Sequence, residues 1–308
     1  MWRPIAKKLG YGLHASISRN RWLSELYLNA AGRLCRRLRD RPWKHFVLNS
    51  IYSVPWPAMQ LKQVTTHFPA GELEAVLFPN LDDLGFQAHL YRRLPYESEV
   101  FQWLTSRSYR TIVEIGANVG VFSLFLAKRF PQAAVYSFEP SRKVFSRLLA
   151  NVAANDCPNL SVFNCAISSE SGFLNFFEPA GHLTNGSLHA SFASIFSPQV
   201  ATTSVPVLAG CLIEPLFAQP PFLVKLDVEG AEPEVLQSLQ GLIGRHRPDL
   251  LIEALPTTEA ALNDLAFLRD GSYHLFNIQP RGLVEQERFI AGQYRDYAVL
   301  PANSPVAH

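Results

Sequence analysis

Short apolar runs alternate with segments of helical periodicity from residue 110 onward. Runs typical of buried strands cover residues 111–115, 134–138, 160–167, 222–228, 250–254, 273–278 and 294–300. Apolar positions at helical spacing fill residues 119–130, 142–154, 233–243 and 259–269, while residues 168–220 are looser and rich in serine. Strands and helices that alternate with short connections form parallel βαβ units. The pattern therefore predicts an α/β fold, with a doubly wound, mostly parallel sheet and an antiparallel C-terminal strand.

The part of the chain before this domain follows a different pattern. Apolar residues recur at helical spacing at Leu23, Tyr27, Ala30, Leu34 and Leu38. Two β-like runs, at 64–68 and 73–78, flank a Pro-Ala-Gly segment and predict a hairpin. We therefore expect a basic helical extension at 1–45, a small β lead-in at 46–95, and a main domain at 96–308 that opens with a helix near Tyr96.

Composition adds few constraints to this picture. The chain has 308 residues, of which 48% are hydrophobic and 18% charged, as in an ordinary globular protein. No stretch of 18 uninterrupted apolar residues is present, which argues against a transmembrane helix. The four cysteines, at positions 35, 157, 165 and 211, form no CxxC pair. We expect reduced thiols and a cytoplasmic protein.

Charge is distributed unevenly. Residues 1–50 carry eleven Lys or Arg and two acidic residues, a net charge of +9, whereas the other 258 residues carry −7. Three interpretations stay open for the basic segment: a helix that rests on an anionic membrane surface, a targeting peptide, or a solvated helix that packs one face on its own domain. No basic platform interleaved with aromatic residues follows it, so a nucleic-acid partner is not expected.

A glycine-containing turn, Glu-Ile-Gly-Ala-Asn-Val-Gly at 114–120, connects the first strand of this domain to its first helix. Gly116 permits a tight turn, Gly120 permits close approach of the backbone to a ligand, and the helix N-terminus offers free N–H groups. Together with Asn118 they form a candidate nucleotide site, and the Glu114 carboxylate is suited to the methionine ammonium of S-adenosylmethionine. An ordinary strand–helix connection is the alternative.

The second strand ends in a carboxylate, Glu139, 25 residues after Glu114. A carboxylate at this place accepts hydrogen bonds from ribose hydroxyls in nucleotide-binding α/β folds. The alternative is a helix cap, because Pro140 and Ser141 follow it. Asn164 and Ala166 lie at the end of the third strand, where an adenine ring is expected.

The run Leu-Val-Lys-Leu-Asp-Val-Glu-Gly-Ala-Glu at 223–232 carries the strongest chemical signal. Alternation along a strand places Lys225, Asp227 and Glu229 on one side, at the edge where open α/β sheets bind ligands. The alternative is a structural network of the three charges. No complete set of metal ligands is apparent, so no metal site is predicted.

These motifs resemble the FkbM family of methyltransferases over about residues 90–280. The resemblance rests on Glu114–Gly120, the Phe-Glu-Pro ending at Pro140 and Lys225–Glu232. Further features that support it are Asn151 and Asn155 at a helix end, the strand at 247–253 and the Tyr-Glu element that ends at Glu97. It implies a class I, Rossmann-like methyltransferase fold, S-adenosylmethionine as the cofactor, and O-methylation of hydroxyls on sugars or natural products. The sequence departs from the family at Glu114, where many relatives have Asp, and at 205–212, which lacks the usual Thr-Leu-Asp.

Asp227 is therefore the first candidate to orient or deprotonate an acceptor hydroxyl, with Glu229 second and Lys225 steadying the alkoxide. His182 and His189, in a Gly/Ser-rich loop, are weaker candidates. The expected acceptor is a small molecule or glycan, including a glycolipid, and the sequence does not specify an oligomeric state. Two other functions stay open: a nicotinamide-dependent oxidoreductase, disfavoured because Asn118 replaces a glycine, and a non-catalytic membrane-docking or partner-docking protein, disfavoured by the intact motifs.

Overall fold

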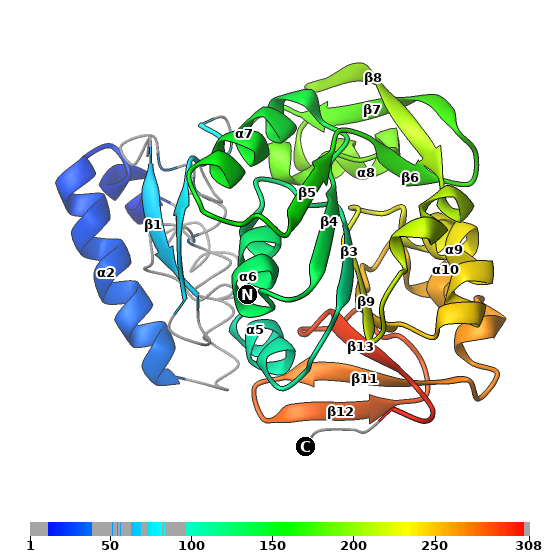
Figure 1. The fold of residues 1–308 in the computed structure, drawn as a ribbon. Helices are drawn as coiled ribbons and strands as arrows, with labels where there is room; N and C mark the ends of the chain where they lie inside the picture. Colours follow the sequence, from blue (N-terminus) through cyan, green and yellow to red (C-terminus); the bar gives the residue numbers. More distant parts are fainter. Residues whose placement is uncertain are drawn as a thin grey trace.

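A computed structural model describes residues 12–38, 51, 54, 56, 63–68, 73–81, 83 and 97–304. Its centre is an eight-stranded sheet in the order β12-β11-β13-β10-β9-β3-β4-β5 (Figure 1). The parallel strands are β3 (Thr111–Ile115), β4 (Ala134–Phe138), β5 (Leu160–Phe163), β9 (Phe222–Leu226) and β10 (Asp249–Glu253). β13 (Asp296–Pro301) lies antiparallel between β10 and β11 (Tyr273–Gln279). The predicted doubly wound, mostly parallel α/β fold is confirmed.

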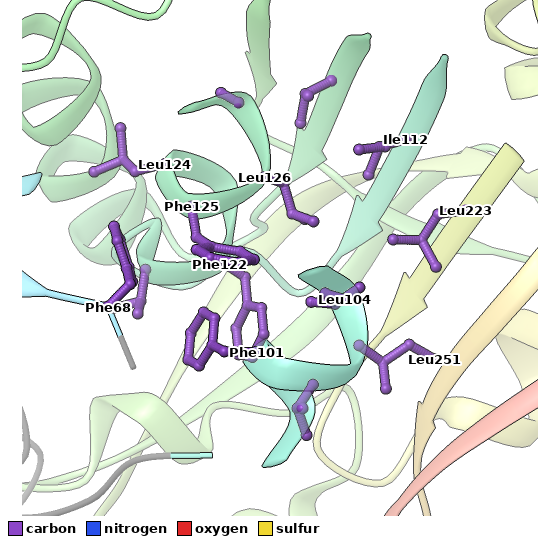
Figure 2. Close-up of a cluster of buried hydrophobic side chains, with 14 of the residues drawn as sticks. Phe68, Phe101, Leu104, Ile112, Phe122, Leu124, Phe125, Leu126, Leu223 and Leu251 are labelled. Atoms are coloured by element: carbon purple, nitrogen blue, oxygen red, sulfur yellow. The ribbon is translucent and has the colours of Figure 1, made fainter. Parts of the chain in front are cut away.

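Side chains alternate between two cores, one on each face of this sheet. Ile112, Leu223 and Leu251 point to the face covered by α5 (Ser98–Thr105) and α6 (Val121–Arg129), as Figure 2 shows. Their neighbours Val113, Val224 and Leu250 point to the other face, which is covered by α9 (Glu232–His246). Because both faces are buried, the central strands read as continuous apolar runs.

The prediction of one strand over residues 160–167 is wrong, because the structure has two strands there. β5 ends at Phe163, and β6 (Ala166–Ser168) belongs to a separate sheet. The Asn164 amide between them donates to the carbonyls of Glu139 and Pro140, at 2.8 and 3.0 Å, and so turns the chain.

The Ser-rich stretch at 168–220 is more regular than the sequence indicated. β7 (Gly172–Pro179) and β8 (Val200–Ala209) form a long antiparallel pair that β6 extends. Between them lie a 3-10 turn, Leu183–Asn185, and α8 (Ala190–Phe196), and a second 3-10 turn, Gly210–Leu216, leads back to β9.

Of the remaining elements, α7 (Arg142–Ala153) matches its prediction closely, and two others differ. The helix expected at 259–269 is instead α10 (Glu259–Asn263) followed by a 3-10 turn, Ala266–Leu268. The exposed edge strand β12 (Gly282–Gln286) was not predicted, because only two of its five residues are apolar.

The predicted hairpin near the N-terminus is present as β1 (Val64–His67) and β2 (Glu74–Leu77). Phe68, which follows β1, packs on Phe101 and Phe125, with ring centroids 5.6 and 5.2 Å apart (Figure 2). The hairpin therefore shares the core of the main sheet.

β2 is also held by two side-chain amides, that of Asn151 in α7 and that of Asn155, two residues beyond the end of this helix. Asn155 accepts from Val76 N–H at 3.0 Å and donates to its carbonyl at 2.7 Å, while Asn151 accepts from Phe78 N–H. α2 (Arg21–Leu38) covers the hairpin's outer side (Figure 1). The three-unit division stays a prediction, because positions 45, 46, 95 and 96 lie outside the described residues.

Two sequence expectations concern the whole chain. In the part that the structure describes, no helix is long and apolar enough to cross a membrane. Cys157, Cys165 and Cys211 are free thiols, and the Cys35 side chain is not described.

Candidate active site

A cavity of about 190 Å³ opens at the carboxyl ends of β3, β4 and β9. Residues from both strongly predicted motifs line it, together with residues from the β7–β8 connection. The predicted site residues that line it are Glu114, Gly116, Asn118, Glu139, Ala166, Lys225, Asp227 and Glu229. The cavity lies where ligands bind in open α/β sheets.

The turn after β3 crosses the turn after β9 at very short range. Gly116 has φ +90°, and a Cβ at this position would lie 1.7 Å from the carbonyl oxygen of Asp227. Asn118 also has positive φ, at 50°. Only glycine fits position 116, both for its φ and for the space.

Gly120 has another role from the one predicted. It is not among the lining residues; a Cβ there would lie 2.5 Å from Leu148 Cδ1 of α7. Its missing side chain admits a neighbouring helix instead of a ligand.

Glu139 is only 6% exposed. Its two oxygens accept hydrogen bonds from Asn118 N–H at 2.9 Å and Ser141 N–H at 2.8 Å. Burial raises the pKa of this carboxyl to about 7, although the two N–H donors oppose the shift. The N-cap of α7 is Ser141, whose hydroxyl accepts from Val144 N–H, so Glu139 is not the helix cap.

Glu114 is 1% exposed and pairs across the sheet with Lys225. The hydroxyls of Ser123 and Ser137 both donate to its Oε2. Burial raises the pKa of Glu114, and the nearby Lys225 ammonium opposes that shift. Its negative charge is thus placed deep in the cavity wall, between fixed donors.

Lys225 is buried and held on two sides. Its Nζ lies 3.1 Å from Asp227 Oδ2 and 4.6 Å from the centroid of the Phe122 ring. Burial alone would lower the pKa of Lys225, but the carboxylates of Asp227, Glu114 and Glu97 outweigh it and raise the pKa. Lys225 therefore stays a cation next to Asp227, whose side chain is 29% exposed.

Asp227 and Glu229 reach the cavity through a turn and not through strand alternation. β9 ends at Leu226, Glu229 has φ +54°, and Val228, which alternation would place on the opposite side, lines the cavity as well. Glu232 closes the turn by accepting hydrogen bonds from the N–H groups of Val228 and Gly230. The predicted grouping is thus observed, but its geometric reason was wrong.

Part of the chain matches a known protein family. The model of the "Methyltransferase FkbM domain" family matches residues 114–275, more than half of the chain. The chain belongs to the FkbM methyltransferase family. Membership confirms the methyltransferase class and, with it, S-adenosylmethionine as the cofactor, and it leaves the nicotinamide alternative without support.

Individual relatives match over shorter stretches. "Methyltransferase sdnD" of Sordaria araneosa is 39% identical over 64 residues, which cover 20% of this chain and 25% of the relative. "Methyltransferase 1" of Beauveria bassiana is 27% identical over 143 residues, or 42% and 57% of the two chains. "31-O-demethyl-FK506 methyltransferase FkbM" of Streptomyces tacrolimicus is 34% identical over 76 residues, or 24% and 29%.

Among solved structures, "Methyltransferase FkbM" from Methylobacillus flagellatus is 17% identical with a TM-score of 0.43, covering 71% of this chain and 53% of that one. The chain spans between a quarter and somewhat more than half of the curated relatives described above.

The cavity of this chain also contains two carboxylates that were not predicted as site residues, Glu97 and Glu253. Glu97 precedes α5 with φ +40°, and Glu253 ends β10. Burial raises the pKa of Glu253, and the carboxylates of Asp227 and Glu229 raise it further. The position of Glu253 at the carboxyl end of a neighbouring parallel strand was a usable signal, and Glu97 belongs to the Tyr-Glu element that forms part of the family resemblance.

The β7–β8 connection forms the wall opposite the sheet. Leu183, Thr184, Gly186 and Leu188 line the cavity from this side. Asp83, from the lead-in, accepts hydrogen bonds from both the backbone N–H and the hydroxyl of Thr184. A segment outside the family match thus holds part of the cavity wall.

The remaining predicted residues lie outside the cavity. Asn164 holds the backbone after Glu139, as described above, while Cys165, Ala166 and Ile167 line the wall in its place. The His182 ring lies 6.2 Å from the Phe196 ring at an interplanar angle of 43°, and His189 lies 3.3 Å from Glu234 on the surface. Within the described residues, no group of three His, Cys, Asp or Glu side chains is arranged to hold a metal ion.

Proposed function

We propose that this methyltransferase transfers the methyl group of S-adenosylmethionine to a hydroxyl oxygen of a sugar, glycolipid or natural-product acceptor. The observation that carries the proposal is the Lys225–Asp227 pair, a buried ammonium that holds a partly exposed carboxylate in the cavity. Such a pair is suited to taking a proton from a neutral hydroxyl.

The residues at the β3–β4 side of the cavity fit the cofactor. A carboxylate has about four acceptor sites, and each oxygen of Glu139 uses one for a backbone N–H, so sites remain for two ribose hydroxyls. Phe138, Ala166 and Ile167 form an apolar wall suited to an adenine ring. Glu114 supplies negative charge for the methionine ammonium. When bound, S-adenosylmethionine supplies an electrophilic methyl group on a good leaving group.

Asp227 is the proposed proton acceptor. The acceptor hydroxyl gives its proton to the Asp227 carboxylate as its oxygen gains the methyl group, and the Lys225 ammonium stabilises the charge that develops on that oxygen. Burial raises the pKa of Glu229 well above its ordinary value, and Asp227 raises it further. The neutral form of Glu229 is therefore favoured, and this form can donate a hydrogen bond to an acceptor.

The experiment has two parts. Calorimetry with S-adenosylmethionine and its demethylated product tests the cofactor site, and absence of binding by both would reject the enzyme. Transfer of radiolabelled methyl into lipid, glycan and small-molecule fractions of an extract identifies the acceptor class. Label that survives mild alkali supports a methyl ether, whereas alkali-labile label indicates a carboxyl acceptor and contradicts hydroxyl methylation.

Asp227→Asn separates the two halves of the proposal. The variant keeps its shape but loses the base, so we expect turnover to fall by about 10²- to 10⁴-fold with cofactor affinity changed by less than about threefold. Asp264→Asn, at an exposed position beyond α10, is the matched control and should leave both unchanged. Normal turnover by Asp227→Asn would show that the base lies elsewhere.

A further inference from the structure

α2 has two distinct faces. On one face Ser24, Leu28 and Ala31 are buried, and the Tyr27 ring stacks on Trp56 with centroids 5.8 Å apart and an interplanar angle of 17°. His14, from the preceding helical residues 12–17, lies 2.6 Å from the Tyr27 hydroxyl. This face anchors the helix on its own protein, as one of the sequence interpretations expected.

The opposite face is apolar and exposed. Trp22 is 68% exposed and Leu26 51% exposed, and Leu23 and Leu34 are exposed beside them. These positions fall on one side of a helix with 3.6 residues per turn. Figure 1 shows α2 (blue) at the outer edge of the molecule, on the far side of the hairpin from the central sheet. Large apolar side chains gathered on one exposed side mark a contact surface.

The same face is basic. Arg33 and Arg37 are exposed, and helical spacing places both among the apolar residues of this side. The one acidic residue of α2 is Glu25, on the flank, where it pairs with Arg21 at 3.1 Å. The outward face, defined here as Trp22, Leu23, Leu26, Leu34, Arg33 and Arg37, thus combines apolar side chains and guanidinium groups without a carboxylate.

We infer that the outward face of α2 binds the surface of an anionic lipid bilayer. The helix is about 27 Å long, so it can lie in the interface with Trp22 and the leucines among the upper acyl chains and the arginines among the headgroups. Arginine stems cover apolar surface while their charged ends reach phosphate, and tryptophan favours the same zone. The contact is independent of the proposed catalytic chemistry.

Charge decides between lipid and the other occupants. A second copy related by two-fold symmetry would bring together two patches that both carry arginines and no carboxylate, and such like-charged patches repel. A nucleic acid would neutralise the arginines but leave Trp22, Leu23, Leu26 and Leu34 without a matching apolar surface. An anionic bilayer satisfies both kinds of side chain. The rest of the chain beyond residue 50, at −7, is repelled by such a surface, which orients the protein with α2 toward it.

Vesicle sedimentation of the full chain tests the inference. We expect binding to vesicles of phosphatidylcholine mixed with phosphatidylglycerol, and little binding to phosphatidylcholine alone. The double variant Trp22→Ser/Leu26→Ser should bind at least about tenfold more weakly, because two buried apolar side chains are lost. Arg33→Glu/Arg37→Glu should lower binding by about thirtyfold or more. Leu212→Ser and Arg281→Glu/Arg288→Glu change exposed residues elsewhere and should bind as the unaltered chain does.

A second measurement reports on position. Lipids brominated near the headgroup should quench the fluorescence of the bound protein, and most of this quenching should disappear in Trp22→Phe. Vesicle binding that survives Trp22→Ser/Leu26→Ser would overturn the inference. The inference would also be overturned if light scattering showed that the unaltered chain is a dimer and that the same double variant is a monomer, because the outward face would then bind a second copy. Vesicle binding is measured without cofactor or acceptor, so its failure leaves the proposed function standing, and failure of that function leaves the vesicle result standing.

Discussion

The two ends of the cavity treat their carboxylates differently. At the end proposed for the cofactor, Glu114 and Glu139 are almost completely buried, and each accepts two hydrogen bonds from serine hydroxyls or backbone N–H groups. At the end proposed for the acceptor, Asp227, Glu229 and Glu253 are partly exposed. Burial raises the pKa of Glu229 and of Glu253, and the nearby Asp227 carboxylate raises both further.

This difference has a physical meaning. Fixed donors hold a charge in place before a ligand arrives, which suits a ligand that is always the same. Crowded carboxylates gain stability from a ligand that supplies hydrogen-bond donors or positive charge, which suits an acceptor that carries hydroxyl groups. On the proposed assignment, the fold organises the cofactor end and the substrate completes the acceptor end.

Gly116→Ala should have the largest effect, because Gly116 lies where the turn after β3 crosses the turn after β9. The new Cβ would meet the Asp227 carbonyl at 1.7 Å in a backbone with φ +90°, so the crossing must open. We expect a loss of more than about 4 kcal/mol in the free energy of unfolding, measured by urea denaturation.

Gly244→Ala is the control for Gly116→Ala. Gly244 lies in α9 with no atom within 4 Å of a Cβ, so alanine should raise stability by up to about 1 kcal/mol. An unaltered midpoint of urea denaturation for Gly116→Ala would mean that the close crossing of the turns after β3 and β9 is not needed for the fold.

Glu139→Gln tests whether the cofactor end depends on charge. Gln keeps the size and one acceptor oxygen but loses the charge-assisted bonds, each worth about 1.5–3 kcal/mol. We expect affinity for demethylated cofactor to fall by about hundredfold in calorimetry. Thermal unfolding without ligand should show that the variant remains folded. An unchanged affinity would remove Glu139 from the cofactor site.

The pH dependence of cofactor affinity should follow the titration of Glu139. The pKa of Glu139 is raised to about 7 in the folded protein, and the proposed contact with the ribose hydroxyls requires the carboxylate form. Affinity should therefore be constant above about pH 7 and fall by up to about tenfold per pH unit below it, as the carboxylate takes up a proton. Calorimetry at about pH 8 and about pH 6 measures this. Glu139→Gln should show no such dependence, and an equal slope in both proteins would assign the titration to another group.

Glu229→Gln should have the smallest effect, at the acceptor end. The raised pKa of Glu229 means that the folded protein favours its neutral form, so stability falls as pH rises above the ordinary pKa of a glutamate. Gln cannot ionise and keeps the acceptor for Asn185, 3.2 Å away. We expect a Tm about 1–3 °C higher than that of the unaltered chain at about pH 8, and equal Tm at about pH 4.

The control for this variant is Glu287→Gln, at an exposed position, which should leave Tm unchanged at both pH values. A Tm gain at acidic pH as large as that at alkaline pH would contradict an electrostatic origin.

Much of the cofactor end could be predicted from sequence, because its residues follow strands. Glu114 and Glu139 each lie at or just beyond the end of a parallel strand, and parallel strands bring such ends to one edge. Gly120 was wrongly placed in the site because a glycine marks a close approach without naming the partner; here the partner is Leu148 of α7.

The acceptor end was predicted less completely because tertiary contacts assemble it. Asp83 and Thr184 are 101 residues apart, and neither segment has a motif that announces their hydrogen bonds. The β7–β8 pair was also missed: Phe173 and Leu174 at its start are exposed, so its apolar pattern does not mark a buried face. Spacing locates residues on strands, but it does not locate a wall built from a loop.

The amides of Asn151 and Asn155 protect the protein from unwanted association. β2 has an edge that no other strand pairs, because its sheet has two strands, and such an edge offers unpaired N–H and C=O groups to any passing strand. Asn155 occupies both groups of Val76, and Asn151 occupies the N–H of Phe78. Two asparagine side chains thus take the place of a third strand, so that β2 can lie against the main domain without offering this edge as a template for aggregation.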